Sequence, residues 1–70
     1  MQRLIEVRLL LAIVTLAEEL SFTRAAKRLG ITQSGLSRRV STLETRYRVK
    51  LFERNHANVT LTDAGRVFVE

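Results

Sequence analysis

Two short helical patterns in this chain are separated by only three residues, residues 30–32. The first pattern covers residues 22–29 and the second about residues 33–47. Ser21 and Thr32 each stand just before a pattern, where a hydroxyl side chain can cap the first turn of a helix. A glycine in the link can end the first helix in the left-handed conformation. Two helices joined by so short a link are typical of a helix-turn-helix.

A longer apolar pattern precedes this pair and predicts a helix over about residues 6–19. The stripe at helical spacing is predicted to face the core, and it comprises Val7, Leu10, Ile13, Val14 and Ala17. Leu9, Leu11 and Leu16 lie away from that stripe. Because a helix that is apolar on two sides usually packs against two neighbours, we predict that Leu9 and Leu16 belong to a dimer surface.

The last third of the chain has a different pattern. Residues 49–54 and 59–61 are predicted to be two short strands, joined by polar and small residues. Thr62 can cap a further helix that begins at residue 63 and is still running at residue 70. Its residues Val67 and Phe68 would be poorly covered, so we expect a longer helix here and assign both residues to the predicted dimer surface.

Positive charge gathers in the middle of the chain. Residues 24–54 contain nine basic and two acidic residues, a charge of +7, whereas the remainder carries −2 and the whole chain +5. Ten of the twelve basic residues are arginine, whose planar guanidinium suits bidentate contacts with phosphate or guanine. A basic middle segment indicates a nucleic-acid binder, with a merely solubilising surface as the alternative.

The outward side of the helix at residues 33–47 is small, polar and basic. Opposite an expected core stripe of Leu36, Val40, Leu43 and Tyr47 it carries Ser34, Ser37, Arg38, Ser41 and Thr45. Such a face can enter a major groove, where arginine binds guanine O6 and N7 and serine or glutamine binds base edges. The predicted base-reading residues are therefore Gln33, Ser34, Ser37 and Arg38. A solvated face rich in serine is the alternative.

Other functional classes find little support. Without cysteine there can be no disulfide and no thiolate metal site, and His56 is the only histidine. Glu18 and Glu19 are adjacent on a helix and do not face each other, so they are not expected to form a catalytic pair. We expect no enzyme activity, no metal and no cofactor. The apolar run at residues 9–17 is too short to span a bilayer, and we expect a cytoplasmic protein.

Short motifs follow one another along nearly the whole chain. They are Ser21-Phe22-Thr23-Arg24-Ala25-Ala26, Leu29, Gln33, Ser37-Arg38, Leu43-Glu44, Leu51-Phe52-Glu53-Arg54 and Leu61-Thr62-Asp63-Ala64-Gly65. Together they resemble the LysR-type transcriptional regulators. The resemblance implies a mainly α, winged helix-turn-helix domain over residues 1–62 and the start of a dimerising linker helix, here truncated, over residues 63–70. A small-molecule effector would bind a C-terminal domain outside this chain.

The resemblance also implies site residues. The base- and phosphate-contacting positions of the family fall on the four predicted reading residues and on Gly35, with Thr23 and Arg24 at the phosphates. We add three further backbone contacts and two wing residues: Arg39, Lys50 and Arg54, and His56 and Asn58. The family usually has glycine where Arg48 stands and arginine near positions 57 and 58. The wing would therefore have to use His56 or Arg54 in the minor groove.

The sequence thus predicts sequence-specific binding of double-stranded DNA by a LysR-like bacterial transcription regulator. The helix at residues 33–47 would lie in the major groove, and a homodimer would bind a partly palindromic promoter site. The alternative is a winged helix that serves as a protein-interaction module and docks an acidic partner. Only the first function requires a preferred duplex, so sequence preference separates the two.

Overall fold

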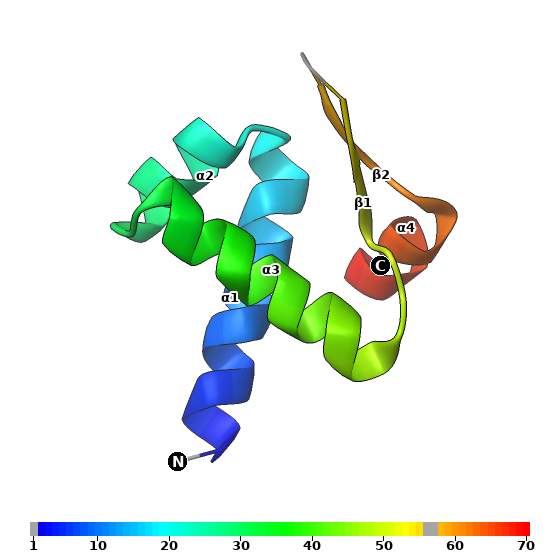
Figure 1. Ribbon diagram of the computed structural model, residues 1–70, viewed down its shortest axis with the longest axis horizontal. Helices are drawn as coiled ribbons and strands as arrows, with labels where there is room; N and C mark the ends of the chain where they lie inside the picture. Colours follow the sequence, from blue (N-terminus) through cyan, green and yellow to red (C-terminus); the bar gives the residue numbers. More distant parts are fainter. Residues whose placement is uncertain (1, 56–57) are drawn as a thin grey trace.

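The computed structural model describes residues 2–55 and 58–70. The elements in these residues are α1 (Gln2–Glu19), α2 (Phe22–Leu29), α3 (Gln33–Tyr47), β1 (Phe52–Arg54), β2 (Val59–Leu61) and α4 (Asp63–Val69). Helices α2 and α3 pack against α1, and α3 crosses it (Figure 1). The antiparallel hairpin of β1 and β2 projects beside them, and α4 returns to contact α1. The predicted winged helix-turn-helix is confirmed.

Caps at the predicted positions fix the bounds of α2 and α3. The side chain of Ser21 accepts a hydrogen bond from the amide of Arg24 at 3.2 Å, and that of Thr32 accepts one from the amide of Gly35 at 3.0 Å. Gly30 ends α2 with φ of 70°, a left-handed conformation that costs glycine little. Both helices begin and end at the predicted residues, because these signals act within a single turn.

The core lies where α1, α2 and α3 meet. Its largest fully buried side chains are Ile13, Leu16, Leu36, Val40, Leu43 and Leu51. From α1, the residues that face it are Leu9, Ala12, Ile13 and Leu16. The predicted dimer role of Leu9 and Leu16 is therefore wrong, since only 5% and 0% of these residues is exposed. Helix α1 is apolar on two sides, and its periodicity alone does not say which side the other helices cover.

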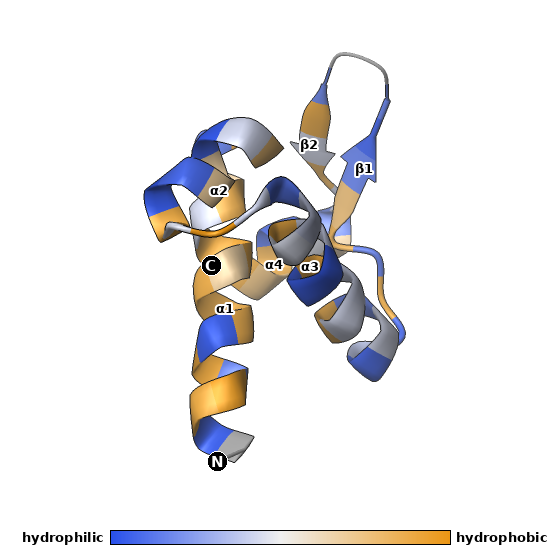
Figure 2. Ribbon diagram, turned by 60° about the vertical axis from the view of Figure 1, so that its left-hand side comes forward, coloured by the Kyte–Doolittle hydropathy of each residue, from blue (hydrophilic) through white to orange (hydrophobic). Residues whose placement is uncertain are grey.

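The stripe of α1 predicted to face the core is divided: Ile13 is buried and Ala17 packs against the core, whereas Val7, Leu10 and Val14 are exposed. The exposed side also includes Leu4 and Leu11. We call the exposed apolar residues of this side the outer α1 stripe: Leu4, Val7, Leu10, Leu11 and Val14, each 42–54% exposed. Apolar colour accordingly covers much of the α1 ribbon (Figure 2). No helix within residues 2–55 and 58–70 is long and apolar enough to cross a membrane.

The C-terminal end of α3 is more exposed than predicted. Tyr47, expected in the core stripe, is 56% exposed because it is the last residue of the helix and lies beyond the buried part of α3. Arg48 then caps α3 with φ of 53°. This is the left-handed region, which a non-glycine residue occupies at a cost of roughly 1–2 kcal/mol.

The base of the hairpin is held by the side chains of Glu44 and Thr62 and by one backbone hydrogen bond, outside the paired strands. One carboxylate oxygen of Glu44, Oε2, accepts the amides of Leu51 and Phe52 at 2.7 and 3.2 Å. The amide of Thr62 donates to the Leu51 carbonyl at 3.0 Å, and its hydroxyl donates to the Lys50 carbonyl at 2.6 Å. The prediction of a strand from residue 49 is wrong for this reason: β1 begins only at Phe52, where pairing with β2 starts.

Candidate nucleic-acid interface

The N-terminal end of α3 is the first part of the interface. The amides of the first turn of a helix lack partners within the helix. Thr32 satisfies the amides of Gly35 and Leu36, through its hydroxyl and its carbonyl. The amides of Gln33 and Ser34 come before these two, at the positive end of the helix dipole, where an anion such as phosphate is stabilised.

The exposed side of α3 combines small hydroxyl side chains with one free arginine. Ser34, Arg38, Ser41 and Thr45 are exposed and Ser37 is half-buried, opposite the buried Leu36, Val40 and Leu43. Within residues 2–55 and 58–70, the Arg38 guanidinium makes no hydrogen bond and no salt bridge. It is therefore free to bind an external acceptor, and its neighbours are too short to keep that acceptor away.

The first predicted reading residue, Gln33, is tied to a predicted phosphate residue on α2. The side-chain nitrogen of Gln33, Nε2, donates to the hydroxyl oxygen of Thr23 at 2.9 Å. Within the described residues, this bond leaves the side-chain amide oxygen of Gln33 and the Thr23 hydroxyl proton free to contact another molecule. The two helices of the motif thus present a joint polar edge.

Ser37 is tied in the same way to the wing. Nη2 of Arg54, the last residue of β1, donates to Oγ of Ser37 at 2.9 Å. The Arg54 guanidinium carbon lies 4.0 Å from the centroid of the Phe22 ring on α2, within the range of a cation–π contact. One side chain therefore joins β1, α2 and α3 on the exposed surface.

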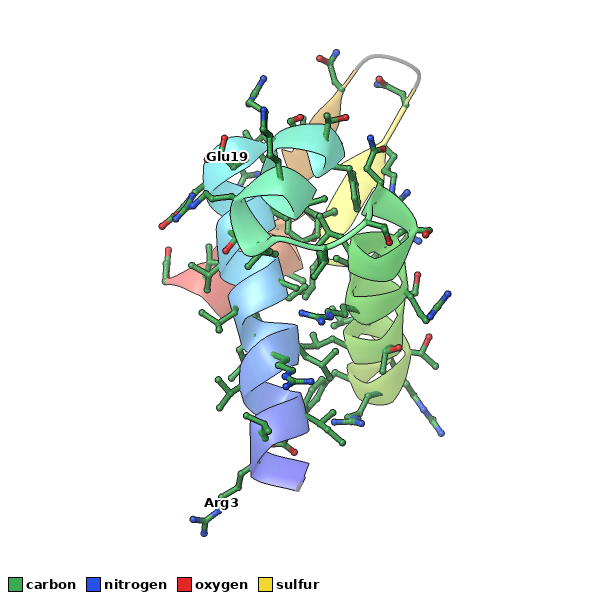
Figure 3. All side chains as sticks on the ribbon, turned by 90° about the vertical axis from the view of Figure 1, so that its left-hand side faces the viewer. Arg3 and Glu19 are labelled. Carbon is green, nitrogen blue, oxygen red and sulfur yellow. The ribbon has the colours of Figure 1, made fainter. Side chains whose placement is uncertain are left out.

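The arginines of α2 are paired with the acidic end of α1. Nε of Arg24 lies 3.3 Å from Oε1 of Glu19, and its Nη2 donates to the Glu19 carbonyl at 2.9 Å. Arg28 pairs with Glu18 at 2.7 Å and with Glu19 at 3.1 Å, and hydrogen bonds to these carboxylates raise the pKa of Arg28. Glu19 lies at the end of α1 beside α2, opposite the end that carries Arg3 (Figure 3).

The other predicted backbone residues lie on α3 and after it. Arg39 is half-buried and Lys50 is exposed, and in the described part of the chain neither side chain forms a salt bridge. In the wing, the amide of Asn58 donates to Oδ1 of Asn55 at 3.0 Å, which closes the base of the turn. The prediction for His56 lies outside the described residues.

Two structural roles escaped the sequence reasoning. Glu44 anchors the start of the wing through the amides of Leu51 and Phe52, and Phe22 supports Arg54, which lies far along the chain. A signal for Glu44 was present, because it is one of only two acidic residues within the basic segment of residues 24–54. No comparable signal marked Phe22.

Comparison with known proteins supports the resemblance to LysR-type regulators seen in the motifs. The family described as bacterial regulatory helix-turn-helix protein, lysR family, matches residues 7–66. The HTH-type transcriptional regulator ShiR of Corynebacterium glutamicum (strain R) is 47% identical over 64 residues, which are 91% of this chain and 22% of ShiR. The chain spans about a fifth of the length of curated relatives such as this one.

Solved structures agree. BenM_DBD in its complex with catB site 1 DNA superposes with a TM-score of 0.85 at 40% identity, over 89% of this chain and 69% of that one. Full-length CbnR complexed with its target DNA gives a TM-score of 0.85 at 37% identity, over 89% of this chain and 22% of that one. The resemblance seen in the motifs is confirmed. With the family match over most of its residues and this shared winged fold, the chain belongs to the lysR family of bacterial regulatory helix-turn-helix proteins, as a DNA-binding domain of such transcriptional regulators.

Proposed function

We propose that this domain binds double-stranded DNA with sequence preference, in the bacterial cytoplasm, with α3 in the major groove. The observation that carries the proposal is the exposed side of α3, where short hydroxyl side chains surround the guanidinium of Arg38, which has no partner among the residues that the structure describes. The DNA in the BenM_DBD and CbnR structures supports it. The domain would control transcription by placing its regulator on a promoter.

The contacts divide into two groups. Gln33, Ser34, Ser37 and Arg38 read base edges. The residues that hold phosphates and the DNA backbone are Thr23, Arg24, Gly35 through its place in the first turn, Arg39 and Lys50. Arg24 would exchange the Glu19 carboxylate for a phosphate oxygen. This exchange costs little, because an exposed ion pair contributes only about 0–1 kcal/mol.

Selection of bound duplexes from a random pool tests the proposal directly. A preferred sequence with two related half-sites is expected, because a symmetric dimer presents α3 twice. A pool that stays random after several rounds would reject base reading. Binding of an acidic protein in its place would then favour the interaction-module function.

Salt should weaken binding steeply. Each phosphate neutralised by lysine or arginine releases a counterion, so the logarithm of affinity should fall with the logarithm of salt concentration by about 0.9 per contact. Titrations of a labelled duplex between low and physiological salt measure the slope. Affinity that stays constant over this range would contradict DNA binding through the basic segment.

The proposed dimer uses the outer α1 stripe together with α4. On α4, Val67 is 71% exposed and Phe68 is 37% exposed, and α4 already contacts α1 within the chain. Residues 63–70 would be the start of a linker helix that pairs with its copy, next to a winged domain of residues 1–62. Covering these apolar side chains would supply the driving force for association.

Leu11→Glu should weaken self-association about tenfold or more, since a leucine that would be buried contributes roughly 1.5–3 kcal/mol. Ile5→Glu is the matched control: Ile5 lies on the same helix with similar exposure, 47% against 52%, but away from the outer α1 stripe. Sedimentation equilibrium of the chain at high concentration measures the difference. An equal effect of the two substitutions would exclude the stripe as the dimer surface.

A further inference from the structure

The guanidinium of Arg54 is held by two other side chains, unlike that of an arginine that is free to bind phosphate. Arg54 lines a hollow of about 450 Å³ between α2 and the wing and another of about 260 Å³ between α3 and β1. With open space on both sides, packing does not confine its guanidinium. Its orientation is instead fixed by the Phe22 ring below it and by the oxygen of Ser37 at 2.9 Å.

The bond to Ser37 has a fixed direction. A guanidinium has donors only, so Oγ of Ser37 must be the acceptor. Within residues 2–55 and 58–70, the Ser37 hydroxyl has no other hydrogen-bond partner, and its proton is free for an acceptor outside the protein. Thr42, on the same helix, shows the contrast: its hydroxyl donates to the Arg38 carbonyl at 2.8 Å and has no proton to offer.

We infer that Arg54 is a positioning residue for base recognition: it turns the Ser37 hydroxyl into a dedicated hydrogen-bond donor. The inference rests on the proposed function, in which Ser37 meets a base edge. In the major groove, guanine, adenine and thymine each offer an acceptor, whereas cytosine offers only its amino donor. Ser37 held by Arg54 should therefore disfavour cytosine at the base that it contacts.

Without Arg54 the preference should be lost. A released serine hydroxyl can rotate and accept a hydrogen bond from the cytosine amino group, or donate to the carbonyl one turn back in its own helix. The wing thus acts on specificity through α3, without touching the base. Phe22 contributes by keeping the guanidinium in place, so α2 takes part in the same arrangement.

The experiment compares the base preferences of four proteins: wild type, Arg54→Lys, Ser37→Ala and the double variant. The Ser37→Ala profile identifies the base pair that Ser37 reads. At that base pair, wild type should bind the duplex with cytosine about three- to tenfold more weakly than the duplexes with the other three bases, as expected for one hydrogen bond. Arg54→Lys keeps the charge and the salt slope, but its flexible, strongly hydrated ammonium lacks the planar guanidinium that stacks on Phe22 and is held toward Ser37. It should therefore lose most of this difference, and it should change nothing further in the Ser37→Ala background.

Two further variants complete the test. Phe22→Leu removes the ring face but keeps an apolar side chain, and it should reduce the cytosine penalty at the same base pair. Arg66→Lys makes the same chemical change on α4, where Arg66 pairs with Asp63, and should leave the profile unchanged. Circular dichroism checks whether each variant is folded.

Several results would overturn the inference. One is an unchanged profile in Arg54→Lys, which would show that Arg54 does not position Ser37; a uniform loss of affinity beside it would make Arg54 a backbone contact. Another is a further change of profile when Arg54→Lys is added to Ser37→Ala, which would mean that Arg54 touches a base itself. Wild type without any base preference would instead reject the proposed function, so the two failures are distinguishable.

Discussion

Arg38→Ala is expected to weaken binding to the preferred duplex by about 1–3 kcal/mol, with the loss concentrated at one base pair. Arg38 stands on the exposed side of α3 with a guanidinium that has no partner in the described residues, and its fork matches O6 and N7 of guanine. Binding to random-sequence DNA should be largely preserved. Titrations of the variant on the selected duplex and on a scrambled duplex measure both effects.

Arg24→Ala is the matched comparison. Arg24 lies near the start of α2 and is proposed to contact only phosphate, so its loss should weaken all duplexes about equally and reduce the salt slope by roughly one unit. Neither arginine contributes to the core. If Arg38→Ala lowered both affinities by the same factor, Arg38 would be a phosphate contact, and base reading would rest on Gln33, Ser34 and Ser37.

Gly65→Ala is expected to destabilise the domain by about 3 kcal/mol, the upper range for forcing an extra group into a packed site. A Cβ atom at Gly65 would collide with the backbone carbonyl oxygen of Leu51, which cannot move without shifting the base of the wing. For a chain of 70 residues this is a large part of the total stability, at roughly 0.05–0.15 kcal/mol per residue. Urea unfolding followed by circular dichroism measures it.

Gly35→Ala provides an unusually close control. Gly35 and Gly65 each stand three residues after a capping threonine, and each donates its amide to that threonine hydroxyl, at 3.0 and 2.9 Å. A Cβ at Gly35 would approach only the hydroxyl oxygen of Thr32, at 3.0 Å, and alanine favours a helix by up to about 1 kcal/mol. The cost of the close contact with Thr32 and the gain in helix propensity should nearly cancel, so the free energy of unfolding should change little. Equal destabilisation by both substitutions would show that the contact with Leu51 does not restrict Gly65.

The sequence by itself determined the helix-turn-helix. The caps at Ser21 and Thr32 and the left-handed Gly30 act within one turn of their own helices, so the bounds of α2 and α3 could be predicted. The buried side of α3 at Leu36, Val40 and Leu43 could also be predicted, because its opposite side is polar and leaves one choice. The basic segment and the polar face of α3 likewise indicated DNA binding, because charge and side-chain size follow directly from residue type.

Only the tertiary structure decided the remaining features. It placed Leu9 and Leu16 inside and the outer α1 stripe outside, a choice that the periodicity of a helix apolar on two sides leaves open. It also distinguished Gly65 from Gly35, which both stand three residues after a capping threonine. The bond between Arg54 and Ser37 joins residues 17 positions apart on different elements. Such contacts depend on how the elements pack, whereas caps and helical periodicity report only on neighbours along the chain.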